Sequence, residues 1–199
     1  MTFVLGLTGS IGMGKSTTAS MFVAEGVPVW DADAAVHRLY APGQPGALAI
    51  APLFPAAIAA DGSVDRPRLR AVLLADPAAL NRLNAAIHPL VAQDRAQFLA
   101  GHAGSDIVVL DVPLLYEGGL ASACDAVVVA SAPPKVQRAR VLDRGMSEAD
   151  LALILSRQMP DAEKRARADY IIPTTALEPA RLAVKTVLAD IRQRIAKHA

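Results

Sequence analysis

The chain has 199 residues, a formal net charge of +1 and an isoelectric point near 7.9, so its charge gives no indication of the broad basic face that binds nucleic acid. Its single cysteine, Cys124, excludes an intramolecular disulfide and a cysteine-based zinc cluster, which favours a cytoplasmic protein with a buried, inert thiol. The N-terminus lacks the basic segment of a signal peptide, and prolines interrupt the uncharged stretch 41–60, so we expect neither a leader nor a membrane span.

A phosphate-binding motif follows the first predicted strand, residues 4–8. Residues 9–16 read Gly-Ser-Ile-Gly-Met-Gly-Lys-Ser, a complete G-x-x-x-x-G-K-[ST] pattern that leads into a predicted helix over 15–24. Its glycines let backbone N–H groups turn toward a phosphate, and the helix N-terminus adds a partial positive charge. We expect Lys15 to reach the β- and γ-phosphates and Ser16 to ligate Mg²⁺. The predicted phosphate-binding residues are Gly9, Ile11, Gly12, Met13, Gly14, Lys15, Ser16 and Thr17.

A second short apolar run, 27–30, leads into Asp31-Ala-Asp33. One of these carboxylates would lie at the carboxyl edge of a sheet, where an aspartate can accept the proton of a hydroxyl that attacks a γ-phosphate. Asp33 also precedes Ala-Ala-Val-His, which has the form of a helix start, so the alternative role is an N-cap. The spacing favours neither role, and Asp33 could fill both.

The stretch 37–105 contains predicted helices and loops but no predicted strand. We expect Asp76 with Pro77 to start one of the helices and Pro89 to kink or end it. The stretch is too long for a simple connection, so we predict a helical subdomain that holds the second substrate. His88 precedes a proline, and a packed or hydrogen-bonded structural role is the simpler alternative to general-base chemistry.

The third apolar run, 107–111, ends in Asp111, the usual form of the second motif in nucleotide-binding proteins. Such an aspartate helps to hold Mg²⁺, commonly through water. Many buried strands also end in aspartate, but the phosphate loop in the same chain favours the metal role. Tyr116 and Glu117 follow at the edge of the expected cleft, where they could bind substrate or cap the turn at Gly118-Gly119.

A fourth apolar run, 126–130, precedes an arginine-rich segment, 135–167, which we predict to be a lid over the phosphates. Arg140 and Arg144 are four residues apart and share a helix face. Guanidinium groups pair with phosphate oxygens and stabilise transition-state charge. For any single arginine a solvated surface position is an equal alternative, whereas the group as a whole favours a phosphate clamp.

The last apolar run, 170–172, completes five short, mostly apolar runs without strict alternation, which are typical of strands buried on both faces of a parallel sheet. Helical stretches separate the runs. We therefore predict an α/β protein with a P-loop kinase fold, in which helices flank a five-stranded parallel sheet. The expected organisation is one domain, 1–199, with its core at 1–36, 106–134 and 168–199, a helical substrate subdomain at 37–105 and a lid at 135–167.

The chain resembles the dephospho-CoA kinases from Gly6 to about Ile172. The likeness depends on the order and spacing of many pieces, each weak by itself beyond the phosphate loop: residues 6–17, 31–33, 61–66, 83–89 and 111–117, Gln137, Arg140, Arg144, Arg157-Gln158 and Ala168-Asp169. The family commonly has glycine where Ser10 stands and often asparagine at the position aligned with Thr174.

The resemblance implies that ATP phosphorylates the ribose 3′-hydroxyl of dephospho-CoA and gives CoA and ADP in the last step of CoA synthesis; Mg²⁺ is the cofactor that the phosphate-loop motif itself predicts. It implies that Asp33 is the catalytic base. We predict that Asp33, Lys15 and Arg140 act in catalysis and that Arg144 binds ATP together with the phosphate loop. We predict that Asp33, His88, Leu115 and Glu117 bind the substrate. Ser16 and Asp111 are the predicted metal-binding residues. We expect ATP and dephospho-CoA as partners, and no nucleic acid, membrane or obligate protein partner.

Three other functions compete with this hypothesis. Another small-molecule kinase, for a nucleotide or a sugar, would have a similar architecture. A GTPase-type switch is disfavoured because the sequence has no Asn-Lys-x-Asp guanine-selecting motif. An ATP-driven remodelling protein would need more interaction surface than a chain of 199 residues readily offers.

Overall fold

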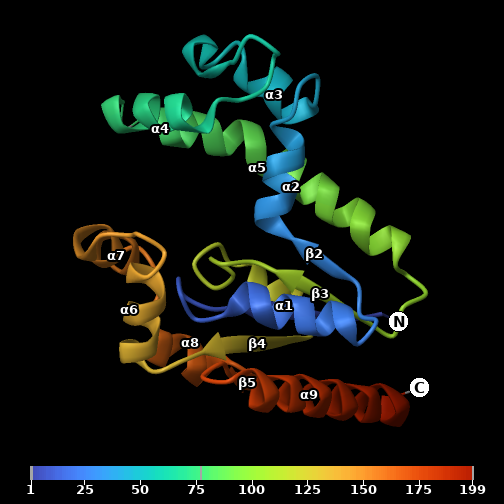
Figure 1. Ribbon diagram of the computed structural model, residues 1–199. Helices are drawn as coiled ribbons and strands as arrows, with labels where there is room; N and C mark the ends of the chain where they lie inside the picture. Colours follow the sequence, from blue (N-terminus) through green and yellow to red (C-terminus); the bar gives the residue numbers. More distant parts are fainter. Residues whose placement is uncertain (1, 77, 199) are drawn as a thin grey trace. The chain divides into compact units, whose positions relative to one another are not determined.

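The computed structural model describes residues 2–76 and 78–198, so Pro77 lies outside the described residues. The elements in chain order are β1 (Phe3–Thr8), α1 (Lys15–Ala24), β2 (Val29–Asp31), α2 (Ala32–Leu39), α3 (Pro45–Ile50), η1 (Pro55–Ala57), α4 (Arg66–Ala75), α5 (Ala79–Gly101), β3 (Ile107–Asp111), η2 (Leu120–Ala123), β4 (Ala126–Ser131), α6 (Pro134–Leu142), α7 (Glu148–Leu155), α8 (Asp161–Arg167), β5 (Tyr170–Pro173) and α9 (Leu177–His198) (Figure 1). They form two compact units, which we call the sheet unit (Met1–Trp30 with His102–Ala199) and the helical unit (Asp31–Gly101).

The sheet has five strands in the order β2-β3-β1-β4-β5, which confirms the predicted fold class. The pairs β1–β3, β1–β4 and β4–β5 are parallel. Because β1 is the central strand, the segment after Thr8 leaves from the middle of the carboxyl edge. The register pairs Leu7 with Asp111 and Thr8 with Val129, so both neighbouring strands end beside the phosphate motif. The second strand ends at Asp31, one residue later than expected.

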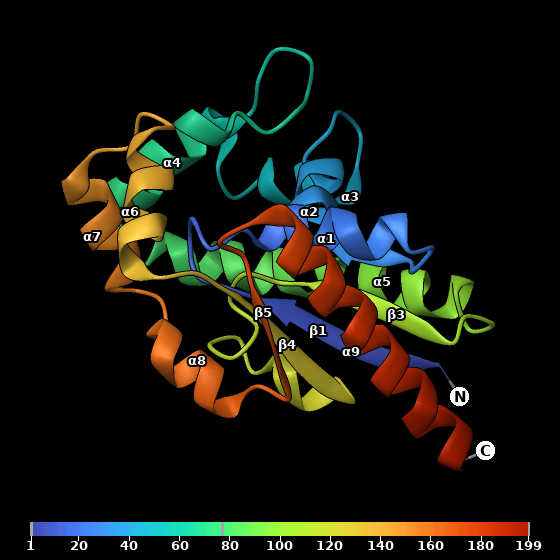
Figure 2. The ribbon, with the colours of Figure 1, turned by 60° about the horizontal axis from the view of Figure 1, so that its bottom comes forward.

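Both faces of the sheet are covered, which explains why its strands read as continuous apolar runs. Along β4, Ala126, Val128 and Ala130 pack into a core that α1 and α9 share, while Val127 and Val129 pack on the other face. The cover on that second face comes from the connection between β3 and β4, with Leu115 at its centre. Figure 2 shows α9 running beside α1 across the first face. Cys124 belongs to the second-face cluster but is only half-buried, so the expectation of a buried thiol was wrong in degree.

Helices α6 and α7 lie beyond the carboxyl ends of the strands, and α8 leads from there along β4 to the start of β5, whereas the two chain ends lie at the opposite end of the sheet unit (Figures 1 and 2). Gly145, at φ +85°, provides the left-handed turn that follows α6. Ser147 then caps α7, because its hydroxyl oxygen accepts the Asp150 N–H at 3.1 Å. The segment 135–167 therefore folds as three short helices at the edge where parallel sheets bind ligands.

The helical unit has its own core, formed by residues that include Ile50, Phe54, Leu83 and Ile87. Its longest helix, α5, contains Pro89 and continues to Gly101, so the expectation that Pro89 could end this helix was wrong. Proline removes one backbone hydrogen bond of a helix. Burial of Leu83 and Ile87 on the preceding turns supplies packing that keeps the helix in place. Asp76 lies before α5, and its carboxylate accepts the Ala78 N–H at 2.9 Å.

Among residues 2–76 and 78–198, no helix combines the length and the apolar character that crossing a membrane requires.

A candidate phosphate-binding site

The loop between β1 and α1 needs its glycines for two physical reasons. Gly12 and Gly14 have φ angles of +73° and +84°, which L side chains rarely adopt. Gly9 has no room for a side chain, because a Cβ there would lie 2.7 Å from the Ala130 carbonyl oxygen. Gly14 is also the N-cap residue of α1, and without a side chain it cannot cap the helix itself. The first N–H groups of α1 therefore face the loop, as an anion site requires.

A cavity of about 290 Å³ lies over this loop. Its lining contains all eight predicted phosphate-binding residues, Gly9 to Thr17 with Ser10 between them, and from elsewhere in the sheet unit Pro113, Arg144, Ile154 and Gln158. Arg144 comes from the segment just after α6, so a guanidinium group and the loop N–H groups converge on one space. A cavity with these donors suits a chain of phosphates.

The two motif residues expected at the phosphates form a close ion pair. Lys15 Nζ lies 2.6 Å from Asp111 Oδ1, and the exposed fractions of the two side chains are 13% and 2%. The pairing of Leu7 with Asp111 in neighbouring strands puts this carboxylate beside the start of the loop. The pair neutralises a buried negative charge next to the site where phosphate charge would arrive.

The residues beside the loop are oxygen donors of the kind that Mg²⁺ prefers. Ser16 offers a hydroxyl in the first turn of α1, and Asp111 offers a carboxylate at the end of β3. The described residues contain no group of three or more His, Cys, Asp or Glu side chains that could hold a metal ion alone. Mg²⁺ in nucleotide sites typically takes one or two protein ligands together with substrate phosphates and water, so this donor set fits it.

Arg140 is fastened to the phosphate loop through Thr174. The Arg140 guanidinium donates to the Thr174 hydroxyl oxygen at 3.3 Å and to the Thr174 carbonyl oxygen. The Thr174 hydroxyl in turn donates to the Met13 carbonyl oxygen at 2.6 Å. Thr174 is buried, and its side chain fills the space beside Gly14. Arg140, Arg144 and Thr174 also line a smaller cavity of about 120 Å³ with Thr17.

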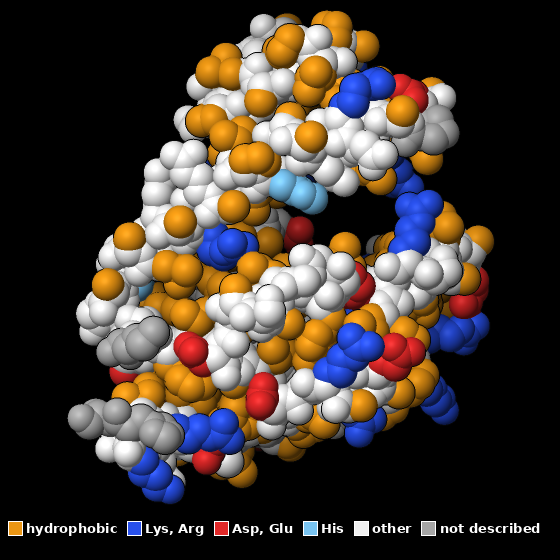
Figure 3. All heavy atoms as spheres, turned by 180° about the vertical axis from the view of Figure 1, so that it is seen from behind, with side chains coloured by type: hydrophobic (Ala, Val, Ile, Leu, Met, Phe, Trp, Pro, Cys, Tyr) orange, Lys and Arg blue, Asp and Glu red, His pale blue; other side chains and the backbone are white. Residues whose placement is uncertain are grey.

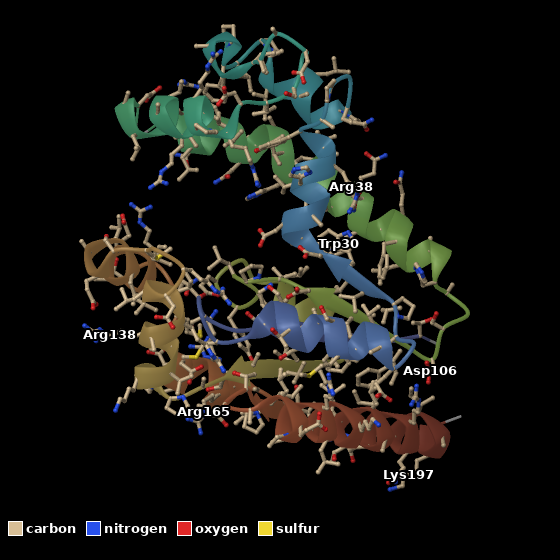
Figure 4. The ribbon with its side chains drawn as sticks, in the orientation of Figure 1. Trp30, Arg38, Asp106, Arg138, Arg165 and Lys197 are labelled. Atoms are coloured by element: carbon tan, nitrogen blue, oxygen red, sulfur yellow. The ribbon has the colours of Figure 1, made fainter. Side chains whose placement is uncertain are left out.

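Arg138, two residues before Arg140, has the solvated surface position that was the alternative to phosphate binding for each arginine. It forms a salt bridge with Glu148, and both side chains are more than half exposed. Figure 4 shows Arg138 on the outer side of α6. On the face drawn in Figure 3, blue and red side chains are interspersed among apolar ones, without one large basic area. Of these arginines, Arg140 and Arg144 lie at the loop.

The Glu117 carboxylate binds two residues of the segment 135–167, Met159 and Lys164. Its carboxylate accepts the Met159 N–H at 2.7 Å and lies 3.0 Å from Lys164 Nζ, and the Lys164 side chain has no exposed surface. Burial alone would raise the pKa of Glu117, but the Met159 N–H and the Lys164 ammonium outweigh it and hold the pKa below its usual value. The Tyr116 carbonyl oxygen accepts the Gly119 N–H at 3.1 Å, so Tyr116 closes the turn through its main chain, whereas the Glu117 carboxylate is engaged with Met159 and Lys164.

Three other predicted residues have quite different surroundings. The Leu115 side chain is fully buried on the second face of the sheet, which leaves only its backbone for contact with a substrate. Asp33 and His88 belong to the helical unit, where His88 is exposed on α5 rather than packed, so its packed alternative was wrong. The N-cap of α2 is Asp31, whose carboxylate accepts the Ala34 N–H at 2.9 Å. Asp33 lies in the first turn of α2, so the expectation that it might serve as the cap was wrong.

The structure adds Gln158, Lys164 and Thr174 to the surroundings of the loop. Gln158 stood in one of the pieces that carried the family resemblance, and Thr174 stood at a position where the chain departs from the family pattern, but no motif assigned either residue a contact. No pattern in the sequence predicted the contacts of Lys164, because its partners Pro113 and Glu117 are 51 and 47 residues away in the chain.

Comparison with known proteins identifies the relatives of this chain. The family model described as dephospho-CoA kinase matches residues 3–178. The dephospho-CoA kinase of Cereibacter sphaeroides is 62% identical over 194 residues, with 96% of each chain covered. The crystal structure of TT1252 from Thermus thermophilus is similar with a TM-score of 0.84 and 32% identity, covering 95% of this chain and 97% of that one. A dephospho-CoA kinase from Campylobacter jejuni, at 22% identity, shares the fold with a TM-score of 0.66 over 94% and 96% of the two chains.

Proposed function

The chain belongs to the dephospho-CoA kinase family, and we propose that Asp33, Lys15 and Arg140 carry out that family's phosphoryl transfer in this protein. The reaction is the phosphorylation of dephospho-CoA by ATP, the last step of CoA synthesis. The ribose 3′-oxygen forms a bond to the γ-phosphorus as the bond from that phosphorus to the β–γ bridging oxygen breaks. ADP leaves, and the hydroxyl proton passes to a base.

The cavity over the phosphate loop is the observation that carries this proposal. Backbone N–H groups between Gly12 and Lys15 would hold the β- and γ-phosphates. The Lys15 ammonium, now paired with Asp111, would bind the terminal phosphates and follow the negative charge as it moves to the leaving group.

Asp33 is our candidate for the base. It stands two residues after Asp31, the last residue of β2, and ligands of parallel sheets bind beyond the carboxyl ends of strands. Since Asp31 caps α2, the carboxylate of Asp33 is not engaged in capping and can accept the proton of the attacking hydroxyl. This assignment also gives the acceptor a defined orientation, because the hydroxyl must donate to Asp33 before it attacks.

Ser16 and Asp111 would hold Mg²⁺, directly or through water. The ion supplies charge neutralisation between the phosphates when it is bound. The Lys15 ammonium, 2.6 Å from Asp111 Oδ1, balances the negative charge of that carboxylate.

The lid and the helical unit complete the proposed machinery. Arg140 and Arg144 would stabilise the charge that spreads over the transferred phosphoryl group, and closure of the lid would exclude water that competes with the ribose hydroxyl. We propose that the helical unit binds dephospho-CoA, with His88 on α5 as one of its contacts. A cytoplasmic location remains a prediction, which fractionation of cells that produce the protein would test.

A panel of acceptor alcohols tests this function. With Mg²⁺ and ATP, dephospho-CoA should support phosphorylation at least tenfold faster than shikimate, gluconate or a nucleoside monophosphate. Equal or faster phosphorylation of any of the other acceptors would contradict the proposed substrate, while leaving the phosphate site itself intact. ATP should serve as donor, and parallel reactions with GTP measure how strict that choice is.

A further inference from the structure

Two glutamines from different helical segments bind the same residue of the phosphate loop. Gln137, on α6, donates from Nε2 to the Ile11 carbonyl oxygen at 2.7 Å. Gln158, between α7 and α8, accepts the Ile11 N–H on Oε1 at 3.1 Å. Both polar groups of the Ile11 backbone are thus held by carboxamides of the segment 135–167, just before the left-handed Gly12.

The orientation of the Gln158 carboxamide follows from its partner. A backbone N–H can only donate, so the atom of Gln158 that faces it must be the carbonyl oxygen Oε1. The Nε2 group carries two N–H donors, and Gln158 is one of the residues that line the phosphate cavity, together with Lys15 and Arg144. An amide whose oxygen is fixed in this way presents donors for an anion and carries no charge that would repel one.

The backbone next to Gln158 is also anchored. The Met159 N–H donates to Glu117 Oε1 at 2.7 Å, and the Glu117 carboxylate pairs with the buried Lys164. Lys164 Nζ also donates to the Pro113 carbonyl oxygen at 3.1 Å, and Pro113 is another wall of the phosphate cavity. The anchor therefore links the end of the lid to the segment that follows Asp111, and it presents Gln158 to the loop.

We propose that Gln158 is a positioning residue for the terminal phosphate of the nucleotide: its oxygen fixes the Ile11 N–H in the loop, and its NH₂ group donates to the phosphate. Gln137 holds the other side of Ile11 and keeps that part of the loop in one conformation. Nucleotide binding at the loop thereby engages the segment 135–167 through an uncharged side chain. This inference rests on the proposed phosphate site but not on the identity of the acceptor.

The test compares Gln158→Ala and Gln158→Glu with the unaltered protein, and uses Gln193→Ala, an exposed glutamine of α9, as the matched control. Calorimetric titration with Mg²⁺ and a non-hydrolysable ATP analogue, in the absence of any acceptor, gives the nucleotide affinity. Thermal unfolding without nucleotide gives the stability of each protein, and steady-state kinetics give KM for ATP and kcat.

We expect Gln158→Ala to weaken analogue binding about fivefold, the effect of losing one hydrogen bond. Gln158→Glu should weaken it more than tenfold and raise KM for ATP, because a carboxylate still accepts the Ile11 N–H but replaces two donors by a negative charge. Its unfolding midpoint without nucleotide should stay close to that of the unaltered protein, as should every property of Gln193→Ala. Analogue binding to Gln158→Glu within twofold of normal, or a loss of stability without a change in affinity, would overturn the proposal. If the Gln158 variants weaken analogue binding as expected but the unaltered protein does not phosphorylate dephospho-CoA, the result would count against the acceptor assignment alone.

Discussion

The Lys164 ammonium, whose side chain has no exposed surface, lies 3.0 Å from the Glu117 carboxylate. Lys164 is on α8 and Glu117 follows β3, so the pair links α8 to the segment that follows Asp111. A fully buried ammonium without partners would cost several kcal/mol. Here Glu117 and the Pro113 carbonyl oxygen satisfy it, and the Thr8 hydroxyl donates to the same Pro113 oxygen at 3.0 Å.

Removing the charge at Lys164 should therefore destabilise the protein. We expect Lys164→Met to lower the free energy of unfolding by about 2–4 kcal/mol, because it leaves the Glu117 carboxylate half-buried without its cation. Urea denaturation measures this change. The control is Lys185→Met, since the Lys185 side chain is 61% exposed and lies 3.6 Å from Glu25. That control should change stability by about 0.5 kcal/mol or less, and an equal effect in both variants would contradict the buried-anchor account.

The same pair predicts a pH dependence. The pKa of Glu117 in the folded protein lies below its usual value of 4.5, so the folded state favours the ionised form. The stabilisation is complete above that usual value and is lost as the pH falls through the lower pKa of the folded state. The difference in unfolding free energy between the unaltered protein and Glu117→Gln should thus be largest near neutral pH and shrink in acid. A difference that grows as the pH falls would have the wrong sign.

Arg140 and Arg138 form a matched pair on one helix. Arg140 binds Thr174 beside the phosphate loop, whereas Arg138 pairs with Glu148 on the outer side of α6. We expect Arg140→Ala to lower kcat about 10²-fold or more through lost transition-state stabilisation, and Arg138→Ala to keep kcat within about twofold. Steady-state rates at saturating ATP and dephospho-CoA decide between them. Similar losses of kcat in both variants would mean that α6 supports turnover through its folded structure and not through the Arg140 guanidinium.

Variants of Asp31 and Asp33 distinguish the capping of α2 from the proposed catalytic role. Asp31→Asn retains an oxygen that can cap α2, so stability and turnover should both stay near normal. Asp33→Asn should keep nucleotide affinity but lose about 10²-fold or more in turnover, the usual size of a general-base contribution. Calorimetry with an ATP analogue and steady-state kinetics measure the two properties. Near-normal turnover of Asp33→Asn would remove this residue from the mechanism.

The parts of the fold that sequence predicts well are those with a strong local cause. The loop of residues 9–14 is predictable because Gly12 and Gly14 need left-handed conformations and Gly9 touches a neighbouring backbone. Strands β3 and β4 are the most predictable of the five, because every residue in them is buried and each reads as a nearly continuous apolar run.

The failures have non-local causes. Pro89 lies inside α5 because packing of the preceding turns outweighs the loss of one hydrogen bond. The cap of α2 is Asp31 because β2 extends to that residue, and two aspartates two residues apart do not reveal where the strand ends. The burial of Lys164 depends on a partner 47 residues away, which only the tertiary fold brings close.

The central claim is that this chain moves the γ-phosphate of ATP to dephospho-CoA. The most direct measurement is ADP release from the purified protein with Mg²⁺ and ATP, with and without dephospho-CoA, together with mass analysis of the acceptor. The account predicts ADP release that depends on dephospho-CoA, with one phosphate gained by the acceptor for each ADP formed. ATP hydrolysis that is indifferent to dephospho-CoA, with no CoA produced, would contradict it.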